Sequence, residues 1–418
     1  MSEQPPTRLA RDLGLGDAIV IGLGSMIGAG VFAAVGPAAD VAGAGLLLGL
    51  GIAAVVAYCN ATSSAALAAV YPTSGGTYVY GRERLGEFWG YLAGWGFVVG
   101  KTASCAAMAL TVGAYAYPQW QRPIAATAVL VLTAVNLRGV RKTAGLTRAI
   151  VAIVLASLVA VVLGCLAGGQ ATSQNLGDLG VGGVRGVLQS AGLLFFAFAG
   201  YARIATLGEE VRDPERTIPK AIPRALMIAL VVYAVVATAA LLAIGPEALA
   251  RSTAPLTSAV EAGSLDWLSP AVRIGGTIAA LGVLLSLIAG VSRTMFAMAA
   301  DGELPRWLDA VHPDHKVPHR AEITVGCLVA ALALLTDLRG AIGFSSFAVL
   351  TYYAIANASA WTLPRPQRRW PRALAAAGVI GCGLLALTLP GSSIAAGSAV
   401  LAAGALLWFA RRRRSGRS

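Results

Sequence analysis

Charged residues are scarce in this sequence. Asp, Glu, Lys and Arg make up 12% of its 418 residues, whereas they make up about a quarter of an average soluble domain. Apolar residues make up 57%, and they form runs of about 17 to 25 residues along the whole chain. One buried core cannot use so many such runs. The composition therefore excludes a large soluble helical protein and predicts an all-α integral membrane protein with many spans.

Cysteine and histidine are scarce as well, with five and three residues. The cysteines are scattered through apolar runs without a CxxC spacing, which excludes a disulfide framework and a cysteine metal site. His312, His315 and His319 have the spacing of helical metal ligands, but Pro313 and Pro318 interrupt the helix that this spacing needs. Walker, GxSxG and HExxH motifs are absent, so we expect no metal, no cofactor and no enzyme activity.

The net charge of +12 reflects topology rather than a nucleic-acid partner. Most Lys and Arg residues lie at the two chain ends and in alternate loops, as the positive-inside rule requires. The pattern predicts a multi-pass protein of the plasma membrane whose termini are both cytoplasmic and whose basic loops contact anionic lipid. The opposite loops hold only four basic residues, Arg122, Arg185, Arg251 and Arg339.

Twelve apolar spans are expected, an even number that keeps both termini on one side. Their approximate bounds are 15–42, 44–69, 87–116, 123–136, 146–168, 187–207, 222–244, 273–299, 321–336, 341–361, 373–389 and 391–410. The predicted organisation is a cytosolic tail (1–13), a first inverted repeat with spans 1–5 (14–168), a second with spans 6–10 (186–361), spans 11 and 12 (371–410) and a basic cytosolic tail (411–418).

Glycine is concentrated where a membrane helix should avoid it. Four of the residues 22–30 are glycine, and each costs about 1 kcal/mol in a helix interior. The sixth span has a related stretch at 198–203. A helix that unwinds at membrane depth exposes amides that bind a carboxylate and carbonyls that bind an ammonium group, as a zwitterionic amino acid requires. The alternative is that these glycines only allow close helix packing.

Residues 24–32 (GSMIGAGVF) resemble the first-helix signature of the amino acid–polyamine–organocation (APC) superfamily of transporters. The resemblance covers about residues 10–365 and is strongest to bacterial permeases similar to cationic amino acid transporters. Further matches follow in order at 71–78 (YPTSGGTY), 195–201 (FFAFAGY), 209–219 (EEVRDPERTIP), 292–305 (SRTMFAMAADGELP) and 312–318.

The resemblance implies a secondary amino acid transporter with a five-plus-five inverted repeat, broken helices 1 and 6 and two extra helices. It implies that the amides of Ala29 and Gly30 bind the substrate carboxylate. It also implies that carbonyls of the two breaks bind the ammonium group and that Phe198 or Tyr201 acts as a gate. The substrate-binding residues implied are Ser25, Met26, Ile27, Gly28, Ala29, Gly30, Phe198, Ala199, Gly200 and Tyr201.

Lys101 lies near the middle of the third span, where a charge costs roughly 2.5 kcal/mol or more without a cavity or partner. Three interpretations are open: it binds the substrate side chain, it titrates and couples transport to protons or replaces a sodium charge, or it is structural. Some relatives carry a lysine on the fifth helix that fills a sodium site. This sequence has Val154 there, so that device is absent.

Charges near the sixth span also have two interpretations each. Arg203 could read the substrate side chain or pair with Glu209 or Glu210. The charged run 209–216 could form an inner gate or a solvated loop. Uptake, export and exchange are all open, with H+ as a candidate coupling ion. A membrane sensor that binds amino acid without transporting it, or a channel, is the alternative from another functional class.

Overall fold

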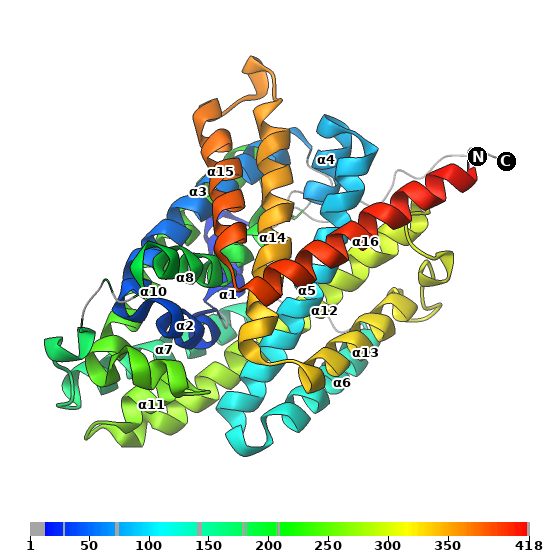
Figure 1. Cartoon of the computed structure of the whole chain (residues 1–418). Helices are drawn as coiled ribbons and strands as arrows, with labels where there is room; N and C mark the ends of the chain where they lie inside the picture. Colours follow the sequence, from blue (N-terminus) through cyan, green and yellow to red (C-terminus); the bar gives the residue numbers. More distant parts are fainter. Residues whose placement is uncertain are drawn as a thin grey trace.

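The structure is a computed structural model that describes residues 13–27, 30–71, 75–139, 144–177, 180, 182–205, 207 and 210–415. Within these ranges it is all-helical, with one isolated parallel bridge between Leu13 and Val211 in place of any strand. The chain forms a bundle of crossing helices (Figure 1). The helices are α1 (Leu15–Met26), α2 (Gly30–Ala42), α3 (Leu46–Val70), α4 (Thr77–Leu85), α5 (Glu87–Ala116), α6 (Gln121–Leu137), α7 (Ala144–Ala167), α8 (Gly183–Phe198), α9 (Ala202–Ala205), α10 (Pro214–Arg251), α11 (Pro255–Glu261), α12 (Ser269–Ala300), α13 (His319–Leu335), α14 (Leu338–Trp361), α15 (Arg372–Thr388) and α16 (Gly391–Ser415).

Each expected span contains a helix, because only a helix satisfies its own backbone groups in lipid. Eight described segments are long and apolar enough to cross a membrane, which confirms a multi-pass helical protein. The count of twelve spans and the inverted repeat remain predictions. Two short helices, α4 and α11, lie between expected spans. The last part of α10 is set off by Gly245, whose φ of 73° is not helical.

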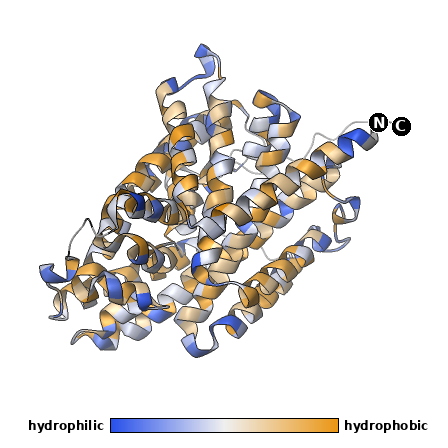
Figure 2. Cartoon of the chain, in the orientation of Figure 1, coloured by the Kyte–Doolittle hydropathy of each residue, from blue (hydrophilic) through white to orange (hydrophobic). Residues whose placement is uncertain are grey.

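Apolar side chains cover the outside of the bundle as well as its interior. Figure 2 shows hydrophobic residues along the helices and hydrophilic ones mainly at their ends. The hydrophobic effect alone does not hold such a bundle together, since lipid tails are as apolar as leucine. Large exposed apolar side chains lie on several helices, among them Leu130, Leu163, Val231, Leu387 and Leu406.

Helix α5 lies at the centre of one half of the bundle, packed against α12 and α14. Small residues bring these helices close together. A Cβ atom on Gly100 would lie 2.8 Å from Cβ of Ala348 on α14. A little further along, Ser104 and Ser345 are joined by a hydrogen bond of 2.6 Å between their hydroxyls. Close backbone approach and buried hydroxyl pairs are the usual means of holding membrane helices together.

A buried amide pair connects α15 to this core. Nδ2 of Asn357 on α14 donates to Oδ1 of Asn60 on α3 at 2.6 Å. Sγ of Cys382 on α15 donates to the same oxygen at 3.3 Å. The amide of Asn357 fits only because α15 has Gly378 there, where a Cβ atom would lie 2.3 Å from Oδ1. Three helices therefore share one buried polar contact.

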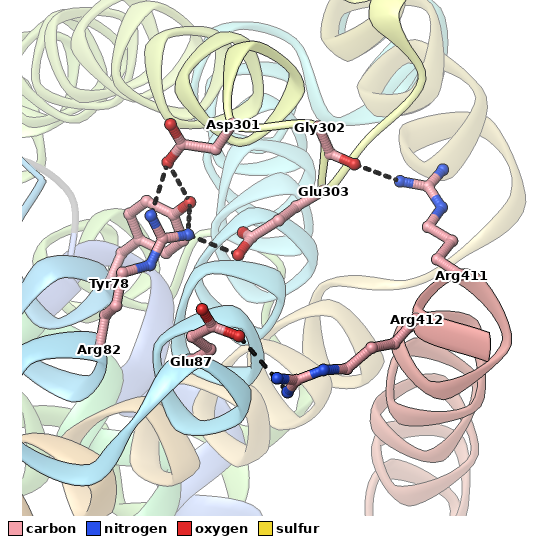
Figure 3. A network of polar contacts seen from close by, with 8 residues as sticks. All are labelled: Tyr78, Arg82, Glu87, Asp301, Gly302, Glu303, Arg411 and Arg412. Carbon is pink, nitrogen blue, oxygen red and sulfur yellow. Dashed lines mark hydrogen bonds and ion pairs between the residues drawn. The ribbon is translucent and has the colours of Figure 1, made fainter. Parts of the chain in front are cut away.

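A charged network closes one end of the bundle, which we call the arginine-rich end (Figure 3). Arg82 on α4 donates to Asp301 at 3.0 Å and to Glu303 at 2.5 Å, beyond the end of α12. Tyr78 donates to Asp301 at 2.5 Å. From α16, Arg411 donates to the carbonyl of Gly302 at 3.3 Å, and Arg412 lies 3.4 Å from Glu87.

Burial dominates the electrostatics of this network. It raises the pKa of Glu303 above its usual range, although Tyr78 and Arg82 act in the opposite direction. It also raises the pKa of Tyr78 well above its usual range, and the hydrogen bond to Asp301 adds to the effect. The hydroxyl of Tyr78 is therefore a permanent donor, and Arg82 is the group that compensates the buried carboxylate of Glu303.

Arg82→Ala should lower the free energy of unfolding by about 1–3 kcal/mol, because it leaves Glu303 buried without its donor. The loss of Arg82 also raises the pKa of Glu303 further. A carboxyl group whose pKa is higher in the folded than in the unfolded protein stabilises the folded state at pH values below its unfolded pKa. This contribution is lost as the pH rises through the folded pKa. The deficit of the variant should therefore be smaller near pH 5 than near pH 8, in thermal unfolding of the detergent-solubilised protein.

The matched control is Arg251→Ala, because Arg251 pairs with Glu247 in an exposed i,i+4 contact of 3.5 Å. Such a pair is worth about 0.3–0.5 kcal/mol. Equal unfolding temperatures for the two variants, or a deficit of Arg82→Ala that grows toward pH 5, would contradict the role given to Arg82.

Candidate functional site

The first helical interruption lies between α1 and α2. Helix α1 ends at Met26, and the amide of Ile27 still donates to the carbonyl of Leu23 at 2.7 Å. Helix α2 starts at Gly30. The implied carboxylate-binding residues Gly28 and Ala29 lie outside the described residues. The flanking residues Met26, Ile27 and Gly30 are buried, so both helix ends lie inside the bundle, away from lipid.

The second interruption lies between α8 and α9. Helix α8 ends at Phe198 and is followed by a 3₁₀ turn, η4 (Ala199–Tyr201). The change of helix type leaves carbonyls without their usual partners. Two tyrosines from other helices supply donors: Tyr233 on α10 bonds the carbonyl of Ala197 at 3.0 Å, and Tyr353 on α14 bonds that of Ala199 at 3.3 Å.

The two interruptions contact each other through their backbones. A Cβ atom on Gly200 would lie 2.3 Å from the carbonyl oxygen of Ser25. A Cβ atom on Gly30 would lie 2.5 Å from Cα of Ala197. Real Cβ atoms do not come so close to backbone, so only glycine fits at either position. The glycines of the two stretches thus allow the broken ends to meet, which is more than the packing of intact helices requires.

Aromatic side chains surround this contact. The rings of Phe198 and Tyr233 are 5.2 Å apart, and those of Tyr201 and Tyr353 are also 5.2 Å apart. Tyr201 is fully buried, and its hydroxyl has no hydrogen-bond partner in the part of the chain that the structure describes. Both aromatic residues named as gates, Phe198 and Tyr201, therefore lie inside the bundle next to the second interruption.

Lys101 is buried, with 8% of its surface exposed. Neither a hydrogen bond nor an ion pair joins its ammonium group to any described residue. It follows Gly100, which packs against α14, and Tyr353 on the same helix reaches the carbonyl of Ala199. Helix α14 thus packs against both the neighbourhood of Lys101 and the second interruption.

Arg203 and Leu13, which precedes α1, both contact Glu210 after the second interruption. Arg203 on α9 lies 3.6 Å from Glu210, one of the two pairing partners considered for it. The other expected partner, Glu209, lies outside the described residues. The amide of Leu13 donates to the carbonyl of Glu210 at 3.1 Å, and the amide of Arg212 donates to the carbonyl of Leu13 at 2.9 Å. The hydroxyl of Ser25 donates to the carbonyl of Ile21 in the same helix at 3.0 Å.

Comparison with known proteins decides the family. The profile of a family described as amino acid permease matches residues 13–412, nearly the whole chain. The chain belongs to this amino acid permease family. The match confirms the resemblance seen in the sequence motifs, and it makes the protein a transporter rather than an enzyme.

Relatives of the permease carry transporter names. It is 64% identical over 408 residues to an uncharacterized transporter of Mycobacterium tuberculosis, with 97% of this chain and 92% of that protein covered. It is 26% identical over 397 residues to the branched-chain amino acid permease BcaP of Bacillus subtilis, covering 89% and 84%. It is 32% identical over 379 residues to human cationic amino acid transporter 4, covering 84% of this chain and 60% of the relative.

Sequence reasoning missed the tyrosines that bond the interrupted helix of the permease. Tyr233 and Tyr353 lie within long apolar helices. Tyrosine in membrane helices is enriched at the interfaces, where its hydroxyl reaches water. A tyrosine away from the helix ends needs an internal partner, and this signal could have drawn attention to both residues. Their partners, the carbonyls of Ala197 and Ala199, could not be read from the sequence.

Gly200→Ala should disrupt the contact between the interruptions, because its methyl group would meet the backbone of Ser25. We expect a lower thermal unfolding temperature and a loss of amino acid binding in the purified permease. Gly290→Ala is the matched control, since a Cβ atom at Gly290 in α12 meets nothing within 4 Å. That change should be neutral or stabilising by up to about 1 kcal/mol. Equal effects of the two substitutions would refute the contact.

Proposed function

We propose that this permease moves amino acids across the plasma membrane by alternating access, with the substrate bound where the two interrupted helices meet. The observation that carries the proposal is the paired backbone contact of Gly200 with Ser25 and of Gly30 with Ala197. Ends of broken helices inside a bundle present unpaired amides and carbonyls to one small volume. A zwitterionic amino acid has one charge for each of these groups.

The proposed roles follow from helix polarity. Helix α2 begins at Gly30, so its first amides and the positive end of its dipole suit a carboxylate. Helix α8 ends at Phe198, so carbonyls at and after that point suit an ammonium group. The carbonyl of Ala199 accepts a hydrogen bond from the hydroxyl of Tyr353. This supports the proposal that the same carbonyl can accept a hydrogen bond from the substrate.

Orientation follows from charge. We place the arginine-rich end, with Arg82, Arg411 and Arg412, in the cytosol, as the positive-inside rule favours. Both termini then lie in the cytosol, and twelve spans in a five-plus-five inverted repeat with two additional helices account for the chain. The name of BcaP from Bacillus subtilis mentions branched-chain amino acids, and those of several other relatives mention cationic ones. We propose that the substrate is an amino acid of one of these two classes.

Counterflow in proteoliposomes tests the proposal. Vesicles with the purified permease and an excess of one unlabelled amino acid inside should take up the same labelled amino acid faster than vesicles without protein. Gly30→Leu should abolish this uptake, since its side chain would meet the backbone of Ala197. Gly51→Leu is the control, because a Cβ atom at Gly51 meets nothing within 4 Å. No counterflow with any of the common amino acids, or normal counterflow in Gly30→Leu, would overturn the proposal.

Lys101→Met tests whether Lys101 helps to choose the substrate. Methionine keeps much of the apolar stem and removes the charge. If Lys101 contacts the side chain of the substrate, the ratio of counterflow rates among acidic, neutral and basic amino acids should change about tenfold, since this corresponds to about 1.4 kcal/mol. Lys220→Met, at an exposed position of α10, should leave the ratio unchanged. An unchanged ratio in Lys101→Met would exclude a contact with the substrate side chain and leave Lys101 with a coupling or a structural role.

A further inference from the structure

Glu322 is a buried carboxylate in the first turn of α13. Only 3% of its surface is exposed. Its Oε2 atom is buried and has no hydrogen-bond partner in the described part of the chain. A carboxylate that is buried without a partner is costly when charged, so such a group binds a proton, finds a counter-charge or serves a function. The site between the interrupted helices does not use it.

The charges around Glu322 come from two helices. On α12, Arg293 is the charged group that acts on it. On α13 itself, His319 lies one turn earlier and Arg320 points to solvent and donates to the carbonyl of Trp307 at 3.3 Å. Helix α6 packs antiparallel to α13, with Thr133 against Gly326. That register places a neutral residue, Asn136, level with Glu322, and no charged group of α5 or α6 acts on the carboxylate.

Three histidines, His312, His315 and His319, lie just before and at the start of α13, between the buried Glu322 and the surface. Residues three apart lie on the same face of a helix, so His319 is one turn from Glu322 on α13, without a hydrogen bond between Nδ1 of His319 and Oε2 of Glu322. Nδ1 of His319 is buried without a hydrogen-bond partner among the described residues. The ring of His312 lies 5.6 Å from that of His319 and 4.8 Å from that of His315. Exposure rises along this series, from the buried Glu322 through the half-buried His319 and His312 to the exposed His315.

The arrangement suits protons better than a metal ion. Nδ1 of His312 accepts the amides of Asp314 at 3.2 Å and His315 at 3.3 Å. This nitrogen is therefore occupied as an acceptor and is not free to bind a metal ion. No three His, Cys, Asp or Glu side chains in the described ranges are placed to hold a metal. Imidazole is the side chain that takes up and releases protons near neutral pH.

We propose that Glu322 is the proton-binding residue of transport, and that His319 carries protons between it and the solution at the arginine-rich end. In the last step an N–H bond of His319 breaks and an O–H bond forms on Glu322, so the imidazolium becomes neutral and the carboxylate becomes a carboxylic acid. The inference rests on the proposed function and identifies H+ as its coupling ion. It needs no lysine on the fifth helix, where this chain has Val154.

Infrared spectroscopy of the full-length protein in liposomes tests proton binding without any substrate. Between about pH 8 and pH 5, where most exposed carboxylates stay ionised, wild-type protein should gain a C=O signal from buried carboxyl groups, namely Glu322 and any contribution from Glu303, whose pKa is also raised. Glu322→Gln should lose the part of this signal that belongs to Glu322. Glu247→Gln, at an exposed carboxylate of the opposite end, should keep it. The same signal in Glu322→Gln as in wild type would overturn the proposal.

Transport tests coupling. With the amino acid that shows counterflow in wild type, Glu322→Gln should keep counterflow and lose accumulation driven by a pH gradient, whereas Glu322→Asp should retain both. His319→Gln should slow proton-driven accumulation more than counterflow. Accumulation equal to wild type in Glu322→Gln would overturn the coupling role. If wild type shows no counterflow at all, the proposed function fails, while the infrared result still decides whether Glu322 binds a proton.

Discussion

The structure depends on a backbone contact between two helices that are both interrupted. Gly200 and Gly30 have no side chains at the two places where the interrupted helices touch. The backbone of Ser25 lies against Gly200, and that of Ala197 lies against Gly30. An interrupted helix inside a membrane protein must have its freed backbone groups satisfied by protein, water or ligand. Here the residues that flank the two interruptions lie against each other, inside the bundle, and tyrosines bond two carbonyls at the second interruption.

The rest of the bundle holds this contact in place. Tyr233 and Tyr353 reach it from α10 and α14, which both follow the second interruption along the sequence. Tyr115 at the end of α5 bonds the carbonyl of Phe32 in α2 at 3.1 Å and packs edge-on against its ring. Three hydroxyls from three helices thus fix carbonyls of α2, α8 and η4. Each of these bonds is directional, whereas apolar packing in lipid is not, so the tyrosines determine where the interrupted helices lie.

Sequence reasoning could predict the helices because lipid makes one demand of every span, and a long apolar run is its direct record. It could also place the interruptions, since glycines at 28 and 30 and at 200 carry a local cost that only an unusual backbone explains. It could not place α4 or the network of Arg82, Asp301 and Glu303. Those contacts join residues more than 200 positions apart, and nothing in a single sequence shows which charged loops meet. The amide pair of Asn60 and Asn357 could not be predicted for the same reason.

The two interrupted helices are also tied together beyond their contact. Leu13, which precedes α1, exchanges backbone hydrogen bonds with Glu210 and Arg212, which follow α9. The segments α1 and α9 are therefore joined at both ends, by Gly200 against Ser25 at one and by Leu13 at the other. A force on α9, such as a change in the charge facing Arg203, would act on α1 as well. A tie of this kind favours movement of the two segments as one unit, and it would let a change in the charge around Arg203 influence the site proposed between the interrupted helices.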